Sequence, residues 1–358
     1  MYNRISPKTN YFRGFLHIKP TDTKLKIIAM RIRLLLLMSC CLAGVTISAN
    51  GQVLLKNPAN KSAATKVLIK KDSSLNFIAM GDWGRNGADH QKQVAAQMGI
   101  TAEQMHAQFI ISTGDNFYPS GVISEHDPLF KYSFEDIYTS FALQWDWYPV
   151  LGNHDYKSNP DAQVAYTKIS RRWKMPSRYY AKKFPINGDK SQQVLIVFMD
   201  TNPLIPEFYK NPEYGPNVKS QDTTAQKKWL AQTLGDNSPE IKWKIVVGHH
   251  PMFTGGSRTE TYDTKSIRGT LKPILDKYGV DVYLSGHEHS LQYIKPAGKT
   301  HHFISGAASE RTPVKMIDDM EMGASVYGFM TFSVRKNEII MQALNDEGDI
   351  IYSTSITK

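Results

Sequence analysis

The segment LNFIAMGDWG, residues 75–84, joins an apolar run of strand length to a polar cluster. A run this apolar is typical of a strand that is buried on both faces of a sheet. The cluster Gly81-Asp82-Trp83-Gly84 follows directly, where the strand would reach its carboxyl end. Open α/β sheets place their binding sites at this edge. The segment therefore predicts both a fold class and the position of a site.

Four more polar clusters follow short apolar runs of strand length further along the chain, among them the runs Phe109–Ser112 and Tyr148–Leu151, which we expect to be strands. They are Gly114-Asp115-Asn116-Phe117-Tyr118, Gly152-Asn153-His154-Asp155, Gly248-His249-His250-Pro251 and Gly286-His287-Glu288-His289. Together the five clusters supply carboxylates, an amide, a phenol and imidazoles, which is a ligand set that suits two adjacent metal ions. This composition indicates hydrolysis, with a phosphate ester as the expected substrate.

Helical patterns alternate with the apolar runs. Asp222–Leu234 predicts a helix that Asp222 can cap, and Thr264–Tyr278 predicts another. Pro273 lies inside the second pattern, so this helix is expected to be kinked or split. The closing stretch from Tyr327 to Ile356 is typical of consecutive antiparallel strands. The order predicts a layered α/β fold, with one domain at 74–358.

The first 51 residues have the order of a cleaved signal peptide. Arg31 and Arg33 precede the apolar run Leu34–Met38, and small residues lead to a cut before Gln52. The apolar run is too short and too near the N-terminus to favour a permanent membrane span. The protein is therefore expected to be exported, either to the periplasm or outside the cell.

Two alternatives concern the same segment. Met30 is an alternative start, because the first 29 residues have no pattern of their own. A lipid on Cys40 is the less favoured alternative, because Met38 fits a lipoprotein signal poorly. Both cysteines, Cys40 and Cys41, precede the cut, so the exported chain can form no disulfide. Residues 52–73 are polar and rich in lysine, which predicts a flexible lead-in.

The charge of the exported chain is small. The whole chain carries +10, but the first 51 residues hold eight Lys or Arg and one Asp, which leaves +3 for the rest. This balance gives no case for nucleic-acid binding.

We expect a monomer that acts on a small phosphate ester.

The spacing within the clusters suggests separate roles for their donors. His287 and His289 are two residues apart, so both imidazoles lie on one side of an extended segment and Glu288 points away. One segment can thus reach two metal ions. Asp115 is the candidate for a bridging carboxylate, and Asn153 offers a neutral amide oxygen.

The order of the clusters resembles the calcineurin-like metallophosphoesterases and, within them, the purple acid phosphatases of the small, tartrate-resistant type. Two details select this subfamily. Gly84 stands in the first cluster where most of the superfamily has histidine, and Tyr118 stands three residues after Asp115. The resemblance spans roughly residues 74 to 310. It implies an α/β/β/α sandwich with the metal ligands on loops at the carboxyl ends of strands.

The resemblance also implies a ligand set for each metal ion. One ion would be held by Asp82, Asp115, Tyr118 and His289, and the other by Asp115, Asn153, His249 and His287. The family precedent makes the first ion Fe(III) and the second Fe(II), Zn or Mn. Phenolate and carboxylates are hard donors that suit Fe(III), whereas imidazoles suit a divalent ion. Tyrosinate on ferric iron would colour the protein purple.

Two metal ions about 3.5–4 Å apart can lower the pKa of a bound water and clamp a phosphate, so the expected mechanism is attack by a metal-bound hydroxide. His154 is the first candidate for the general acid or phosphate-orienting residue, with Asp155 fixing its tautomer. His250 is the second candidate, and packing beside His249 is its alternative role. Arg258 stands where the mammalian-type pattern has another histidine; it can hold phosphate but donates a proton poorly.

The reading that follows is an exported dinuclear-metal acid phosphatase acting on phosphate monoesters. One alternative is a phosphodiesterase or nucleotide hydrolase with the same metal centre, since surrounding loops can change the substrate without changing the ligands. A second is an iron-binding module without significant turnover.

Overall fold

The computed structural model describes residues 46–48, 51–57, 68–69 and 72–358, within a compact unit that runs from Val45 to Lys358. Apart from residues 46–48 and 51, the expected signal segment lies outside the described residues, as do the alternative start at Met30 and the lipid site at Cys40. Among the described helices, none combines the length and the apolar character that a membrane crossing requires.

In the described part of the chain, nine strands form one mixed sheet and six strands form another. The larger sheet has the order β1 (Thr46–Ser48), β2 (Gly51–Leu55), β12 (Met320–Ser325), β10 (Leu291–Ile294), β11 (His301–Ser305), β9 (Val282–Ser285), β8 (Ile241–Val247), β7 (Asp189–Phe198) and β6 (Tyr180–Ile186). The smaller sheet has the order β15 (Ile350–Thr357), β14 (Glu338–Asn345), β13 (Gly328–Val334), β3 (Leu75–Met80), β4 (Phe109–Ser112) and β5 (Asp146–Pro149). Strands β3, β4 and β5 run parallel, and so do β7, β8 and β9.

Aromatic side chains pack between the two sheets. Phe77 on β3 stacks on its cross-strand partner Phe332 on β13, with ring centroids 4.9 Å apart. The Phe332 ring lies edge-on to Phe303 of β11, in the other sheet, at 5.6 Å. All three side chains are buried. Such pairs add to the apolar burial that joins the sheets into a sandwich, and the predicted α/β class is confirmed.

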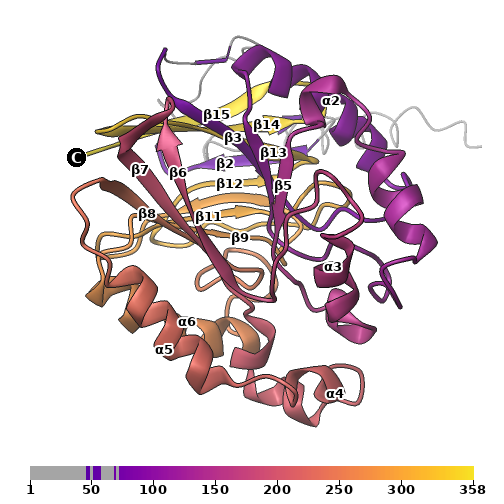
Figure 1. Ribbon diagram of the computed structural model, residues 1–358. Coiled ribbons are helices and arrows are strands. Elements are labelled where there is room, and N and C mark those ends of the chain that lie inside the picture. The colour runs from indigo at the N-terminus through magenta and orange to yellow at the C-terminus, as the bar shows by residue number, and fades with distance from the viewer. Residues whose placement is uncertain (1–45, 49–50, 58–67, 70–71) are drawn as a thin grey trace, which may run out of the picture. The chain divides into compact units, whose positions relative to one another are not determined.

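Helices cover the sandwich on both sides (Figure 1). The helix α2 contacts β3 and β13 of the smaller sheet, whereas α5 and α6 lie on the opposite side of the strands in Figure 1. The α-helices are α2 (Gln91–Met105), α3 (Pro160–Tyr166), α4 (Gly215–Val218), α5 (Thr223–Leu234) and α6 (Tyr262–Lys277). The short helices are η2 (Phe130–Glu135), η3 (Phe141–Leu143), η4 (Asp155–Lys157), η5 (Asn202–Leu204) and η6 (Pro206–Lys210).

The two predicted helices form, with one difference. Asp222 caps α5 as expected, because its side chain accepts hydrogen bonds from the amides of Thr224 and Ala225. The helix α6 runs on as one helix through Pro273 rather than splitting. Leu271 and Leu275, on either side of this proline, are both buried in the same core. Apolar packing therefore holds the helix in place before and after Pro273.

The part of the expected lead-in nearest its start is a strand. Strand β2 (Gly51–Leu55) pairs antiparallel with β12, and Leu54 is only 7% exposed. The apolar run Val53-Leu54-Leu55 explains this pairing, since it can bury a side chain while its backbone satisfies the edge of β12. At these residues the structure therefore differs from a flexible lead-in. The three closing strands β13, β14 and β15 pair antiparallel in sequence order, as predicted.

Candidate metal centre

The carboxyl ends of β3, β4 and β5 meet those of β8 and β9 from the other sheet. The Asp82 amide donates to the Gly114 carbonyl at 2.9 Å, which ties the first two loops of the smaller sheet together. The His287 amide donates to Asp82 Oδ2 at 3.0 Å, which joins the loops of the two sheets. All seven predicted metal ligands lie at this junction, namely Asp82, Asp115, Tyr118, Asn153, His249, His287 and His289.

One half of the centre forms around the Tyr118 hydroxyl. The oxygen lies 3.2 Å from Asp82 Oδ1, 3.1 Å from Asp115 Oδ2 and 3.2 Å from His289 Nε2. His289 Nε2 is also 3.5 Å from Asp82 Oδ1. Four donor atoms from three separate loops therefore converge on one small space. We refer to this set as the Tyr118 half.

The other half forms around His249. Its Nε2 lies 3.4 Å from Asp115 Oδ2, 3.2 Å from Asn153 Oδ1 and 3.2 Å from His287 Nδ1. We refer to this set, with Asp115, as the histidine half. The same oxygen of Asp115 approaches both the Tyr118 hydroxyl and His249, so this carboxylate occupies the position of a bridge between two ions.

The ligand loops have unusual backbone conformations. Asp82, Asp115 and His287 have φ values of 61°, 50° and 68°, in the left-handed region that non-glycine residues seldom adopt. Gly152 faces Asp115 so closely that an added Cβ would lie 2.1 Å from Asp115 Oδ1. Local strain of this kind costs about 1–3 kcal/mol per residue and is found mainly at functional sites. The fold therefore holds these side chains in positions that the isolated loops would not favour.

Each of the three histidines predicted to bind metal has its second ring nitrogen beside an acceptor. His249 Nδ1 lies 2.9 Å from the carbonyl oxygen of Thr113, and His287 Nε2 lies 2.8 Å from Asp263 Oδ2. His289 Nδ1 lies 3.1 Å from Glu310 Oε2. This arrangement fixes the tautomer and turns the other nitrogen toward the centre, as is usual for metal-binding histidines. Neither Asp263 nor Glu310 was predicted from the sequence, because each is far from its histidine along the chain.

Burial and neighbouring charges shift the pKa values of the polar groups at this junction. Burial and the charges of Asp115 and Asp82 raise the pKa of Tyr118 well above its usual value. Burial lowers the pKa of His249, but the charge of Asp115 outweighs it and raises that pKa to about 9. Burial lowers the pKa of His287 to about 4, so this imidazole is neutral. Without metal, the proton on His249 partly offsets the charge of the buried carboxylates, and Tyr118 remains a neutral phenol.

These donors fit two metal ions. Hard anionic oxygens dominate the Tyr118 half, and neutral nitrogen and amide donors dominate the histidine half. Buried groups of three His or Asp residues also meet the spacing that an ion requires, among them Asp82, Asp115 and His249. A bound cation would replace the protons that Tyr118 and His249 carry, since metal ligation requires the deprotonated forms.

Comparison with known proteins identifies the family of this chain. The family described as Calcineurin-like phosphoesterase matches residues 75–291. This chain belongs to that family. Purple acid phosphatase 7 of Arabidopsis thaliana is 35% identical over 315 residues, which cover 85% of this chain and 90% of the relative. Tartrate-resistant acid phosphatase type 5 of Oryctolagus cuniculus is 33% identical over 305 residues, covering 80% and 91%. The predicted relationship to purple acid phosphatases, including the small type, is confirmed.

Solved structures share the phosphoesterase fold. The anchor GAP50 of the inner membrane complex of Plasmodium aligns with a TM-score of 0.69 at 23% identity, covering 80% of this chain and 89% of that one. A purple acid phosphatase from yellow lupin (Lupinus luteus) seeds aligns with a TM-score of 0.60 at 12% identity, covering 80% and 54%. At these identities the likeness concerns the fold alone, and it agrees with the two-sheet sandwich.

In this phosphoesterase, His154 lies beside the bridging carboxylate. Its amide donates to Asp115 Oδ1 at 2.8 Å, and its ring centroid is 4.3 Å from that of Tyr118. Its Nδ1 lies 2.6 Å from the Pro119 carbonyl oxygen, which can accept the Nδ1 proton. The expectation that Asp155 fixes this tautomer is wrong. Asp155 is buried and instead accepts hydrogen bonds from the Gly152 and Asn116 amides, which hold the loops together.

His250, the second candidate for proton transfer, is fully buried in the phosphoesterase. Its Nδ1 lies 2.8 Å from Thr201 Oγ1, and its ring centroid is 4.5 Å from that of His287. Burial, together with the neighbouring imidazoles, lowers its pKa well below the usual value. These contacts match the packing role that was the alternative, and the catalytic role stays a prediction.

Glu288 connects the phosphoesterase centre to the loop that carries Arg258. Its carboxylate is fully buried, accepts from the Arg258 amide at 2.8 Å and lies 3.5 Å from Arg258 Nη1. An added Cβ on Gly256 would lie 2.2 Å from Glu288 Oε2, so this loop position requires glycine. Glu288 lies between the predicted ligands His287 and His289 in the sequence. Its contacts with the loop therefore hold Arg258 near the histidine half.

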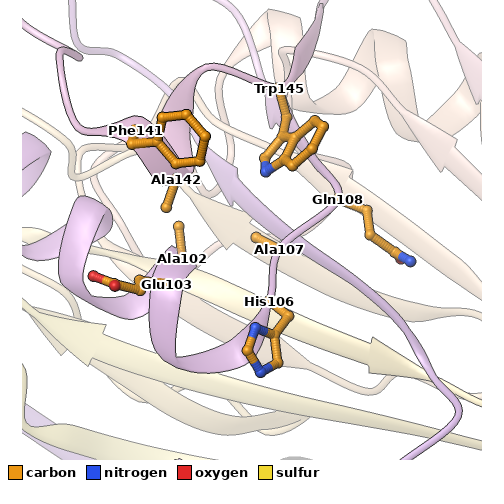
Figure 2. Close-up of a pocket in the computed structure, with 8 residues that line it drawn as sticks. All are labelled: Ala102, Glu103, His106, Ala107, Gln108, Phe141, Ala142 and Trp145. Atoms are coloured by element: carbon orange, nitrogen blue, oxygen red, sulfur yellow. The ribbon is translucent and has the colours of Figure 1, made fainter.

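A separate pocket of about 540 Å³ lies at the other edge of the phosphoesterase sheets (Figure 2). His106, Ala107 and Gln108 precede β4, and Trp145 precedes β5, so the pocket is at the amino ends of these strands. The predicted metal ligands instead follow the carboxyl ends of strands. The pocket is bordered by Phe141, which is 88% exposed, and by Trp145, and it contains none of the predicted ligands.

Proposed function

We propose that this calcineurin-like phosphoesterase is an exported purple acid phosphatase that hydrolyses phosphate monoesters with two metal ions. The observation that carries the proposal is the shared oxygen of Asp115, 3.1 Å from the Tyr118 hydroxyl and 3.4 Å from His249 Nε2. A bridging carboxylate between a phenol and an imidazole matches a centre that holds two unlike ions. The identities with purple acid phosphatases support the same activity.

Fe(III) is the ion proposed for the Tyr118 half, and Fe(II), Zn or Mn for the histidine half. The support is the donor chemistry, because carboxylates and a phenolate prefer the harder ion. When bound, the metal pair supplies Lewis acidity that activates a water molecule and neutralises charge on the phosphoryl oxygens. Because water is the attacking group, this mechanism requires no nucleophilic side chain.

His154 is proposed to protonate the leaving alcohol. The Pro119 carbonyl engages Nδ1, which leaves Nε2 available to carry the proton, and the Asp115 carboxylate positions the His154 backbone. This residue is partly exposed, whereas His250 is fully buried. Access to the substrate therefore favours His154 over His250 as the general acid.

Arg258 is proposed to hold the phosphate or a second anionic group of the substrate. Its guanidinium is 34% exposed and its distance of 3.5 Å from Glu288 leaves it free to form shorter charge-assisted hydrogen bonds to a ligand. Tyr214 stands nearby, with its hydroxyl 3.4 Å from Asn153 Nδ2. Arginine keeps its charge at all accessible pH values, so this contact should not weaken between acidic and neutral pH.

The test is the hydrolysis of p-nitrophenyl phosphate beside bis-p-nitrophenyl phosphate, by the processed protein, at acidic and neutral pH with iron and zinc supplied. Preferential turnover of the monoester in acid is the expected result. A preference for the diester would replace the proposal with a phosphodiesterase or nucleotide hydrolase. Absence of turnover on both substrates, with metal bound, would indicate an iron-binding module without significant turnover.

The proposal of export rests on the signal-like segment ahead of Gln52. We also propose that the exported protein is a monomer. N-terminal sequencing of the protein recovered from outside the cytoplasm, together with its mass in solution, tests both. A mature chain that begins near Gln52 is expected. A chain that keeps the apolar run Leu34–Met38 would contradict the cleavage.

A further inference from the structure

Arg85 follows the first ligand cluster directly and covers one face of Tyr118. Its guanidinium carbon lies 3.9 Å from the centroid of the Tyr118 ring. The side chain is only 22% exposed, so the contact is partly shielded from water. A cation at this distance is attracted to the electron-rich face of an aromatic ring, and the attraction is stronger where water is excluded. The attraction should increase further when the phenol becomes a phenolate.

The same guanidinium is also tied to a second ligand of the Tyr118 half. Its Nη2 donates to Glu310 Oε2 at 2.6 Å, and this oxygen lies 3.1 Å from His289 Nδ1. Its Nε donates to Ser309 Oγ at 3.1 Å. Ser309 Oγ in turn donates to the Asp82 carbonyl oxygen. One arginine therefore contacts Tyr118 directly and reaches His289 through a shared carboxylate.

The histidine half is built differently around its ligands. His287 Nε2 lies against the Asp263 carboxylate and His249 Nδ1 against a carbonyl, and Arg258 pairs with Glu288. Among the described residues, Tyr118 is the predicted ligand whose ring has a cationic side chain stacked on it, and that cation is Arg85. The position of Arg85 thus distinguishes the half where a redox-active ion is proposed.

We propose that Arg85 is a positioning residue that tunes the ion held by Tyr118, by withdrawing electron density from the phenolate and by fixing the Glu310–His289 contact. This inference rests on the proposed iron site. The Arg85 guanidinium faces the ring of Tyr118, whereas an ion would bind at the hydroxyl, so the arginine charge should lower the energy of the phenolate electrons more than that of the metal orbitals. Glu310 acts in the opposite sense, because a carboxylate on Nδ1 makes His289 a stronger donor.

The two charges predict opposite effects on the reduction potential of the Tyr118 half. Loss of the Arg85 charge should stabilise the ferric form and lower the potential. It should also move the visible tyrosinate absorption band to longer wavelength, since the phenolate electrons rise in energy. Loss of the Glu310 charge should raise the potential. General damage to the site would not produce opposite signs.

The experiment compares four variants of the iron-loaded protein, Arg85→Gln, Arg85→Lys, Glu310→Gln and Arg268→Gln. The absorption maximum of the oxidised form and the midpoint potential in a redox titration are measured. Arg268 stacks on Phe253, which is not a predicted ligand, with its guanidinium carbon 5.4 Å from the ring centroid, so Arg268→Gln is the matched control and should change neither quantity. Arg85→Lys keeps the charge and should remain close to the wild type.

Each outcome decides between the proposal and its rivals. A longer-wavelength band and lower potential in Arg85→Gln, with a higher potential in Glu310→Gln, support it. An unmoved band in Arg85→Gln, shifts of the same sign in both variants, or an equal shift in Arg85→Lys would overturn it. If Arg85→Gln fails to load iron, Arg85→Met, which also removes the charge, takes its place and the same outcomes decide. A colourless iron-loaded wild type would instead remove the tyrosinate site, and this inference with it.

Discussion

The Tyr118 half and the histidine half share Asp115 but differ in the charges that surround them. Asp82 and Tyr118 add anionic oxygens to the first, and Arg85 and Glu310 stand outside it, with Glu310 47% exposed. The second uses an amide and two imidazoles, and its outer carboxylate Asp263 is buried. One set of loops therefore offers a hard, charged site and a softer, more neutral site. Because hard and borderline ions prefer different donors, the two halves should favour unlike ions within one centre.

The largest effect should come from removing what the two halves share. Asp115→Asn leaves neither half with its bridging charge, so both ions should be lost together. Activity should fall at least about 10²–10³-fold, the loss that follows removal of one preorganised charge-stabilising group. Metal content and phosphatase turnover measure it. The exposed Asp136→Asn is the control, and retention of two ions by Asp115→Asn would refute the bridge.

The next effect separates the halves. Tyr118→Phe removes a direct ligand from one half only, so the visible colour should disappear while the histidine half still binds a divalent ion. Loss of even an outer hydrogen-bond partner costs about 10–100-fold in metal affinity, and loss of the phenol should exceed that for iron. Metal titration followed by absorption measures both halves. A variant that stays purple would contradict the tyrosinate assignment.

A smaller effect should come from the outer carboxylate of the histidine half. Asp263→Asn weakens the acceptor on His287 Nε2, so affinity for the divalent ion should fall about 10–100-fold while the colour of the other half remains. Asp276→Asn, on the exposed side of the same helix, is the matched control. Equal weakening of both halves would mean that Asp263 supports the fold rather than one ion.

A last effect, on stability rather than on metal binding, concerns Asp200, whose neighbour Thr201 contacts His250 behind the histidine half. Burial raises the pKa of Asp200 from 3.8 to about 6. The folded protein therefore retains a proton that the unfolded chain releases, and stability from this group is full below about pH 4 and is lost as the pH rises to about 6. At about 1.4 kcal/mol per pKa unit, the loss is about 3 kcal/mol.

Urea unfolding of the metal-free protein between pH 4 and 6 measures this loss. Asn cannot ionise, so the free energy of unfolding of Asp200→Asn should lack that part of the pH dependence. The exposed Asp136→Asn should retain it. Parallel pH profiles for wild type and Asp200→Asn would show that Asp200 keeps an ordinary pKa.

Local pattern predicted much of the fold. The bounds of β3 and β4 agree with the apolar runs at Leu75–Met80 and Phe109–Ser112, because each is a short buried strand that ends at a glycine-containing turn. Strand β5 lies two residues earlier than the run Tyr148–Leu151 predicts. There the ladder ends at Pro149, which pairs with Ser112 at the end of β4, so pairing rather than hydrophobicity sets the boundary.

For the candidate metal centre, too, the sequence predicted some features and missed others. Residue type and cluster order indicated seven candidate ligands, since each carries donor chemistry in a loop that follows a strand, and the structure brings these side chains together. The proton acceptor for His154 was predicted incorrectly, because Asp155 is adjacent in sequence but its carboxylate is taken by backbone amides. A backbone carbonyl, Pro119, takes the role instead, and every residue has such a carbonyl.

The α/β class, the edge of the sheet that carries the site and the donors at that edge all follow from the sequence, because strand length, apolar pattern and residue chemistry are local properties. The folded arrangement was needed to show which oxygen of Asp115 faces both halves, and that Asp263, Glu310 and Arg85 contact the predicted ligands from outside. Those contacts join segments far apart in the chain. They exist only when the packing of the two sheets brings the loops together.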